Sequence, residues 1–410
     1  MSKIRVICGK KKHKLMKSKL LQILIFTFIA FSSFAQSDSL SEKTKKCSFE
    51  GYFSNMQSVM FDSINRNWIS DNTIHNRLNF SWFPTPTFTA TLQLRNRLIW
   101  GETVKYSPNY SNQIETDNGY LDMSWNIFSE QSFIFNTSID RAFLQYSKGK
   151  FDLKLGRQRI NWGQTMVWNP NDIFNNYSFF DFDYVERPGS DAVRLQYYPS
   201  SSSTIELVAK VNSSEKLTTA ALFRFNKWNY DIQFIGGLLN EQDYIAGAGW
   251  SGAIKSVSFR GEASYFQPKE NFADTNGLVM VSISFDYSFK NSSMILVEGL
   301  YGNFTKNTGL GFMDVYSAPS TVKNLSFTKY NVLAQYSYPV SPLLNISVSG
   351  MYMPEIIGYY AGPTISYSLK DNLDLSLIAQ VFSGEFPNAF TGKKQRINFY
   401  LGFVRLKGNF

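Results

Sequence analysis

The amino-acid sequence predicts an all-β fold, an antiparallel transmembrane β-barrel of about 18 strands, with 16 as the alternative count. Three observations support this fold class. From Ser48 onward, apolar or aromatic residues alternate almost everywhere with small polar or charged residues, which is typical of strands with two different faces. The alternating segments have the length, about ten residues, that a tilted strand needs to cross a bilayer. Long insertions follow only every second segment.

Each alternating segment is bounded by turn residues, which sets the limits of the expected strands. They are residues 48–62, 72–84, 87–102, 138–148, 150–160, 191–198, 203–212, 217–225, 228–239, 243–253, 256–265, 278–290, 293–302, 326–338, 344–353, 358–369, 372–383 and 396–409.

The connections between these strands differ in length by parity. Tight turns such as PTP (84–86) and KGK (148–150) follow the even-numbered strands. The long insertions all follow odd-numbered strands, and they are 103–137, 161–190, 266–277, 303–325 and 384–395. A membrane barrel has short periplasmic turns and longer outer loops, whereas a soluble sandwich gives no reason for this parity. We therefore expect residues 48–410 to form a single outer-membrane barrel.

Residues 1–35 predict a cleaved signal peptide. They contain eight basic residues and no acid, then the apolar run LLQILIFTFIAF, and Ser33 and Ala35 occupy the small-residue positions before the cleavage site. The segment from Met16 would be a complete signal alone, so Met16 could be the true start. Residues 36–47 are expected to form a short periplasmic lead-in.

Removal of the signal peptide changes the charge of the chain. Of 41 Lys and Arg, 33 remain against 32 acids, a net charge of +1, so basicity gives no support for nucleic-acid binding. Cleavage separates Cys8 from Cys47, which excludes an intrachain disulfide. The mature chain has no run of 18 apolar residues that would predict a membrane-spanning helix.

The terminal Phe410 follows an aromatic strand, RINFYLGFVRLKGNF, as in the signal that the barrel assembly machinery of Gram-negative bacteria reads. We therefore expect the mature protein in the Gram-negative outer membrane, surrounded by lipid and lipopolysaccharide.

Alternation assigns one face of each strand to the lumen, and the expected lumen face of strands two to six is rich in cations. These pore-lining candidates are Arg77, Arg95, Arg97, Arg141, Lys154 and Arg194. The opposite wall, with Ser282, Ser284, Asp286, Ser288, Asn345, Ser347 and Ser349, is almost uncharged or acidic. A cationic wall in a narrow pore selects for anions. The alternative is that the charges only keep the lumen wet, with Asp140, Asp152 and Asp191 neutralising the arginines.

The insertion 161–190 is too aromatic for a solvated loop, and loops of this length are usually functional. Folding inward would bury its rings and place Asp183, Glu186 and Arg187 at a constriction; the alternative is an outer lid.

At the preceding strand end, Arg157 and Arg159 share the phase of Leu153 and Leu155, which would direct them to lipid. A bulge near Gly156 is expected to turn both inward; otherwise they would contact lipid phosphates.

The motifs GRQRINWGQ, NPNDIF and ERPGSDAVRLQYY resemble those of large outer-membrane porins related to the alginate-export family. The resemblance is concentrated in residues 156–198. It implies an 18-stranded monomeric pore, not a trimer, with a cationic lumen for an anionic or bulky polar solute, although alginate itself is not supported. The matching positions are Arg157, Gln158, Arg159, Trp162, Gly163, Asn169, Pro170, Arg187, Pro188 and Gly189.

The sequence therefore predicts a porin for small-molecule or oligosaccharide solutes, without enzymatic activity, cofactor or metal. One alternative is a plugged barrel for polysaccharide binding or export. Another is an outer-membrane hydrolase, for which His75, the one histidine of the mature chain, would be the base; a lone lumen histidine is more often a hydrogen-bonded wall residue. The acidic segment 112–122 could hold calcium outside.

Overall fold

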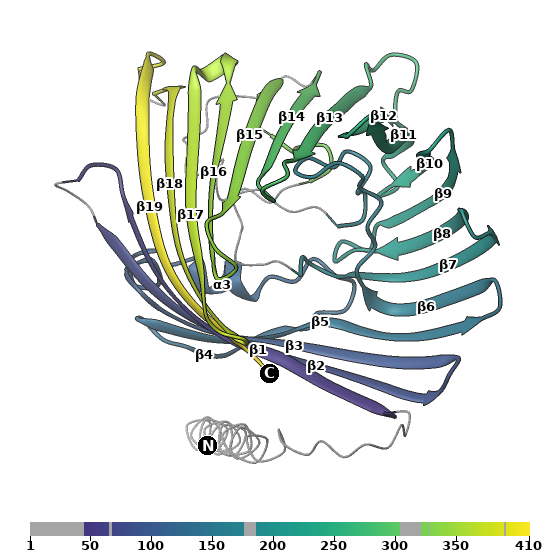
Figure 1. Ribbon diagram of the computed structural model, residues 1–410, viewed down its shortest axis with the longest axis horizontal. Helices are drawn as coiled ribbons and strands as arrows, with labels where there is room; N and C mark the ends of the chain where they lie inside the picture. The colour runs from purple at the N-terminus through teal and green to yellow at the C-terminus, as the bar shows by residue number, and fades with distance from the viewer. Residues whose placement is uncertain (1–44, 65–67, 176–185, 304–320, 327, 389–390) are drawn as a thin grey trace, which may run out of the picture. The chain divides into compact units, whose positions relative to one another are not determined.

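In the described part of the chain, eighteen antiparallel strands close into a barrel in the computed structural model, which confirms the predicted fold class (Figure 1). The structure describes residues 45–64, 68–175, 186–303, 321–326, 328–388 and 391–410. The barrel lies within one compact unit, Cys47–Phe410. The expected signal peptide, 1–35, and most of the lead-in, 36–47, lie outside the described residues.

The strands alternate along the chain with turns and loops. The barrel strands are β1 (Cys47–Phe61), β2 (Ile69–Thr85), β3 (Phe88–Gly101), β5 (Phe133–Lys148), β6 (Phe151–Gln158), β7 (Ser190–Ser200), β8 (Ser203–Val211), β9 (Leu217–Lys227), β10 (Tyr230–Leu239), β11 (Asp243–Ile254), β12 (Val257–Pro268), β13 (Leu278–Ser288), β14 (Met294–Gly302), β15 (Tyr330–Pro339), β16 (Leu344–Met353), β17 (Gly358–Lys370), β18 (Leu373–Pro387) and β19 (Lys394–Asn409). The smaller elements are α2 (Glu102–Tyr106), α3 (Tyr110–Glu115), β4 (Ser124–Ser129) and η1 (Pro354–Ile356).

Pairing of β1 with β19 closes the barrel, with register from Tyr52↔Asn409 to Phe61↔Tyr400. Closure leaves no open strand edge, as a barrel in lipid requires. Because neighbouring barrel strands are antiparallel, their connections alternate between the two rims, and the five long insertions all begin and end at one rim. Phe410 exchanges backbone hydrogen bonds with Gly51 at 2.9 and 3.0 Å, which fixes the last residue to β1.

The wall between β3 and β6 is less regular than the alternation predicts. The expected insertion 103–137 was too long, because β5 begins at Phe133 and β4 pairs along its first residues. β4 occupies the position beside β5 that the short β6 leaves open above Gln158. A bulge lies in β5, where Gln93 pairs with Arg141 and Leu94 pairs with Ile139. Asp140 is the extra residue, so the side chains of Asp140 and Arg141 are both buried.

Exposure follows the predicted phases of the strands. The outward side chains Leu92, Val193 and Phe285 are 40, 49 and 42% exposed, whereas the inward Arg77 and Ser282 are 1 and 0% exposed. No helix among the described residues is long and apolar enough to cross a membrane.

Three polar side chains interrupt the apolar outer face of β2, β3 and β5 in one cross-strand row. Thr137 Oγ1 donates to Asn96 Oδ1 at 3.0 Å, and Asn96 Nδ2 donates to Asn76 Oδ1 at 3.2 Å. Asn76 Nδ2 then donates to the carbonyl oxygen of Tyr52 at 3.2 Å. The three side chains thus find partners in one another and in the backbone of β1.

Candidate functional site

The segment after β6 leaves the wall and crosses the interior of the barrel (Figure 1). We call residues 159–175 the lumen loop. The indole N–H of Trp162 donates to Glu206 of β8 at 2.8 Å, and Gln233 of β10 donates to the carbonyl oxygen of Trp162 at 2.7 Å. The loop therefore folds inward onto the lumen wall, as expected, and does not form an outer lid.

Two wall carboxylates hold the middle of the lumen loop through its backbone. Glu262 of β12 accepts hydrogen bonds from the N–H groups of Gln164, Thr165 (2.7 Å) and Asn171 (2.9 Å). Glu298 of β14 accepts from the N–H groups of Met166 (3.0 Å), Val167 (3.1 Å) and Trp168 (2.6 Å). Sequence reasoning missed both acids, although each stands alone among small and apolar neighbours on a lumen phase facing the loop.

An apolar core lies beneath the lumen loop. Its loop members include Trp162, Trp168 and Phe174, and its wall members are inward side chains of β8 to β18 such as Phe266 and Leu333, both 0% exposed. Part of the inward face of the barrel is therefore apolar and buried. The loop's own rings are buried in this core, and their burial stabilises its docked position.

Local packing explains the W-G pair at the start of the loop. Trp162 is 1% exposed, and its ring meets Phe174 edge-on with centroids 4.9 Å apart. A Cβ at Gly163 would lie 2.1 Å from the side-chain oxygen of Asn169, so this approach needs glycine. Trp162 is therefore a buried anchor of the loop, not an exposed residue of a constriction.

The chain comes back to the wall near residue 186, where side chains of β5 and β1 bind it. Arg141 Nη2 donates to the carbonyl oxygens of Glu186 and Arg187, each at 2.7 Å. The hydroxyl of Tyr52 in β1 donates to the Glu186 carboxylate at 3.2 Å. Asp183, the other acid expected at the constriction, lies outside the described residues.

The three arginines of β2 and β3 are integrated into the wall. Arg77 pairs with Asp140 and donates to Asn79 (3.1 Å) and Gln93 (2.7 Å). Arg95 Nε donates to His75 Nε2 at 3.3 Å. Arg97 donates to Asn136 at 2.8 Å and to the carbonyl oxygen of Ile114 in α3 at 3.2 Å. These contacts fit the alternative interpretation, in which neighbouring groups of the wall bind the arginines, better than they fit a row of free charges.

Lys154 and Arg194 lie side by side on β6 and β7 and keep part of their surface open. Lys154 Nζ stands 4.5 Å from the ring centroid of Phe143. Arg194 donates to Gln196 at 2.8 Å, and its carboxylate neighbour Asp152 is 3.8 Å away. At 15% side-chain exposure, Arg194 is more accessible than Arg77. This pair is therefore better placed to meet a solute than the buried Arg77 and Arg95.

Closure of the barrel adds two cations that sequence reasoning missed. Arg405 and Lys407 of β19 alternate with Val404 and Leu406, which are 49 and 41% exposed on the outer face. Lys407 Nζ lies 4.0 Å from the ring centroid of Tyr52. Because β19 pairs with β1, the basic wall continues across the seam. The alternation in FVRLKGNF, combined with the expected closure, was the available signal.

The register shift expected at Gly156 is absent. β6 pairs with β5 and β7 without interruption through Arg157, while Gly156 itself has φ 111°. Arg157 stays on the outward phase but is 5% exposed, because it pairs with Asp117 (2.5 Å) and Asp191 (2.7 Å). It neither turns into the lumen nor faces lipid; it fastens the segment around Asp117 to the rim.

Arg159 and Arg187 act electrostatically on a buried acid of the lumen loop. Asp172 is 1% exposed, and burial raises the pKa of its carboxyl from 3.8 to about 7, although Arg187 and Arg159 oppose this shift. Lys210 of β8 lies beneath the same turn and donates to the carbonyl oxygen of Phe174 at 2.9 Å. The turn therefore carries charge of both signs within its packed interior.

Contacts at His75 and in segment 112–122 bear on the alternative functions. His75 is 2% exposed and packs edge-on against Tyr52, and its Nε2 accepts the bond from Arg95. Asp117 accepts from the N–H groups of Gly119 and Met123, each at 2.8 Å, as well as pairing with Arg157. No group of three His, Cys, Asp or Glu that could hold a metal occurs in the part of the chain that the structure describes.

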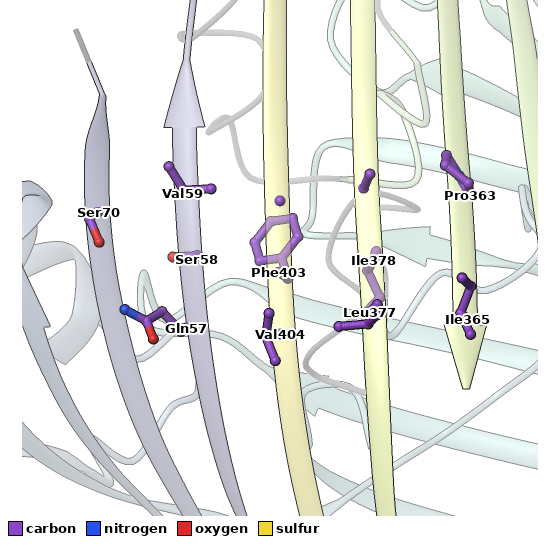
Figure 2. A pocket seen from close by; sticks show the side chains of 12 residues that line it. Gln57, Ser58, Val59, Ser70, Pro363, Ile365, Leu377, Ile378, Phe403 and Val404 are labelled. Carbon is purple, nitrogen blue, oxygen red and sulfur yellow. The ribbon is translucent and has the colours of Figure 1, made fainter. Parts of the chain in front are cut away.

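A shallow groove of about 490 Å³ crosses β1, β17, β18 and β19 (Figure 2). Its exposed side chains Ile365, Leu377 and Val404 have the phase of the other outward residues. The groove thus belongs to the outer face and not to the lumen.

The barrel is similar to several solved structures. OccAB1 of Acinetobacter baumannii is 11% identical, with a TM-score of 0.56, and the match covers 91% of this chain and all of that one. OccAB2 of the same organism is 10% identical, with a TM-score of 0.56 over 90% and 100%. OccK11 (OpdR) of Pseudomonas aeruginosa is 11% identical, with a TM-score of 0.51 over 89% and 96%.

No protein-family model and no curated protein sequence matches the chain, so the resemblance to the alginate-export family stays a prediction. The structural matches concern the fold alone. That fold is a closed antiparallel β-barrel of eighteen strands.

Proposed function

We propose that the protein is an outer-membrane channel that passes small or extended anionic or polar solutes past a cationic wall, with its calibre narrowed by the lumen loop. The observation that carries this proposal is the division of the lumen. Lys154, Arg194, Arg405 and Lys407 lie on β6, β7 and β19, whereas the lumen loop packs against β8 to β14. A solute that passes beside the loop meets the basic side, where a positive field favours anions.

The proposal includes export and insertion. The signal peptide at 1–35 directs the chain across the inner membrane, and Phe410, held against β1, presents the terminal residue that the barrel assembly machinery reads. The mature chain acts as a monomer in lipid and lipopolysaccharide, without a cofactor.

Reversal potentials of the purified protein in planar bilayers test the selectivity. We expect a preference for anions in a salt gradient. The double variant Lys154→Glu with Arg194→Glu should shift the reversal potential towards cations, because it reverses two charges on the open part of the wall.

The matched control reverses two charges outside the lumen. Lys227→Glu with Lys255→Glu alters exposed residues at the ends of β9 and β11 and should leave selectivity unchanged. A cation preference in the unaltered protein would exclude the charged-wall mechanism. The absence of any current would favour the plugged barrel for polysaccharide binding.

A further inference from the structure

Two buried carboxylates accept hydrogen bonds from the backbone of neighbouring parts of the lumen loop. Glu262 and Glu298 are both 0% exposed and lie on β12 and β14, with β13 between them. Together they accept the backbone N–H groups of residues 164 to 168 and of Asn171.

These backbone groups depend on the wall for partners. Residues 159–169 contain no strand or helix, so the loop does not pair its own N–H groups in a regular ladder. A buried N–H without an acceptor loses its hydrogen bonds to water without compensation, so each carboxylate offsets several such penalties. Neutral wall groups also bind the loop but reach fewer of its atoms; the hydroxyl of Ser264, for example, lies 2.9 Å from the carbonyl oxygen of Pro170 and 2.7 Å from Asn171 Oδ1.

The negative charge of these acids matters for holding the loop, because several hydrogen-bond donors point at each carboxylate. An ionised carboxylate has two acceptor oxygens with about four lone-pair sites and no donor. A glutamine of the same shape keeps one acceptor oxygen and places an NH2 group where N–H groups already point. Hydroxyl contacts add to each cluster, with Thr165 donating to Glu262 at 2.9 Å and Ser282 donating to Glu298 at 3.1 Å.

We propose that Glu262 and Glu298 are positioning residues of the channel, which fix the path of the lumen loop through its backbone and so set the calibre of the pore. This inference rests on the proposed channel function, but not on its anion selectivity.

The test is the isosteric double variant Glu262→Gln with Glu298→Gln, studied in planar bilayers. We expect single-channel conductance to rise about twofold or more, with larger current fluctuations, and neutral polyethylene glycols of larger size to enter, because the loop is released. Heat-modifiable migration in detergent gels identifies folded barrel before each recording.

Asp286→Asn is the matched control. It removes a carboxylate charge from β13, between the two glutamates, where Asp286 pairs with Arg260 at 2.7 Å instead of the loop. Conductance and the polymer size limit should then stay at the values of the unaltered protein. A rise equal to that of the double variant would overturn the proposal, because wall charge alone would explain the effect.

A shortened loop that lacks residues 164–171 separates positioning from any other role of the acids. In that background, the two Glu→Gln changes should add nothing to conductance. A folded double variant with unchanged conductance and unchanged polymer limit would overturn the proposal. A wider pore in a protein without anion preference would support it while contradicting the selectivity mechanism.

Discussion

The basic wall and the loop-bearing wall use charged side chains in opposite ways. On β2 and β3, Arg77 and Arg95 meet side chains of the same wall, as in the pair Arg77–Asp140. On β12 and β14, the carboxylates of Glu262 and Glu298 meet the backbone of a segment about a hundred residues earlier in the chain. Charge thus stiffens one wall and positions an inserted loop on the other, so disruption of the two walls should have different consequences.

Removal of the partner of Arg77 should give the largest loss of stability. Asp140→Asn leaves a guanidinium that is 1% exposed with only the more distant carboxylate of Glu186, 3.9 Å away. Loss of one member of a buried pair costs about 3–5 kcal/mol. We expect a lower temperature for the heat-modifiable gel transition, with little change in conductance below it. The comparison variant is Asp374→Asn, which changes an inward acid of β18 that accepts a hydrogen bond from Ser368. An equal fall of the transition temperature in both variants would show that the ion pair of the basic wall contributes no more to stability than this hydrogen bond.

On the loop-bearing wall, Trp162→Phe should be milder and local. It retains an aromatic ring against Phe174 but removes the indole donor to Glu206. A buried acceptor left without its partner costs about 1–3 kcal/mol, all of it at the lumen loop. Current fluctuations should therefore increase while the gel transition of the barrel moves little. If the transition temperature fell as far as in Asp140→Asn, the stability of the barrel wall would depend on the docking of the loop, contrary to this expectation.

The rim segment fastened by Arg157 is a smaller test of the same separation. Arg157→Lys keeps the charge but loses the forked contact with Asp191, for which the two distances are 2.7 and 2.8 Å. We expect faster proteolytic cleavage near residues 117–123, with selectivity unchanged because Arg157 lies outside the lumen. A changed reversal potential would instead show that Arg157 lines the conduction path.

The sequence predicted the parts of this comparison that depend on period-two alternation. The phases of Arg77 and Ser282, the strand number and the inward course of the long loop follow from patterns within one segment. The bulge at Asp140 did not, because one extra residue in an otherwise alternating strand looks like ordinary variation. Contacts between distant segments, such as Glu298 with Trp168, cannot be read from local periodicity. The continuation of the basic wall onto Lys407 could have been predicted, because in a closed barrel the last strand lies beside the first.

Asp172 gives the smallest expected effect and concerns the loop alone. Because burial raises the pKa of its carboxyl from 3.8 to about 7, the docked loop favours the neutral form. The contribution of Asp172 to docking is therefore greatest below pH 3.8, falls as the pH rises towards about 7, and is constant above it. Asp172→Asn should remove this dependence, so that current fluctuations at pH 8 become smaller than in the unaltered protein while those near pH 4 stay similar. Identical pH profiles for the two proteins would show that Arg187 and Arg159 already compensate the buried charge.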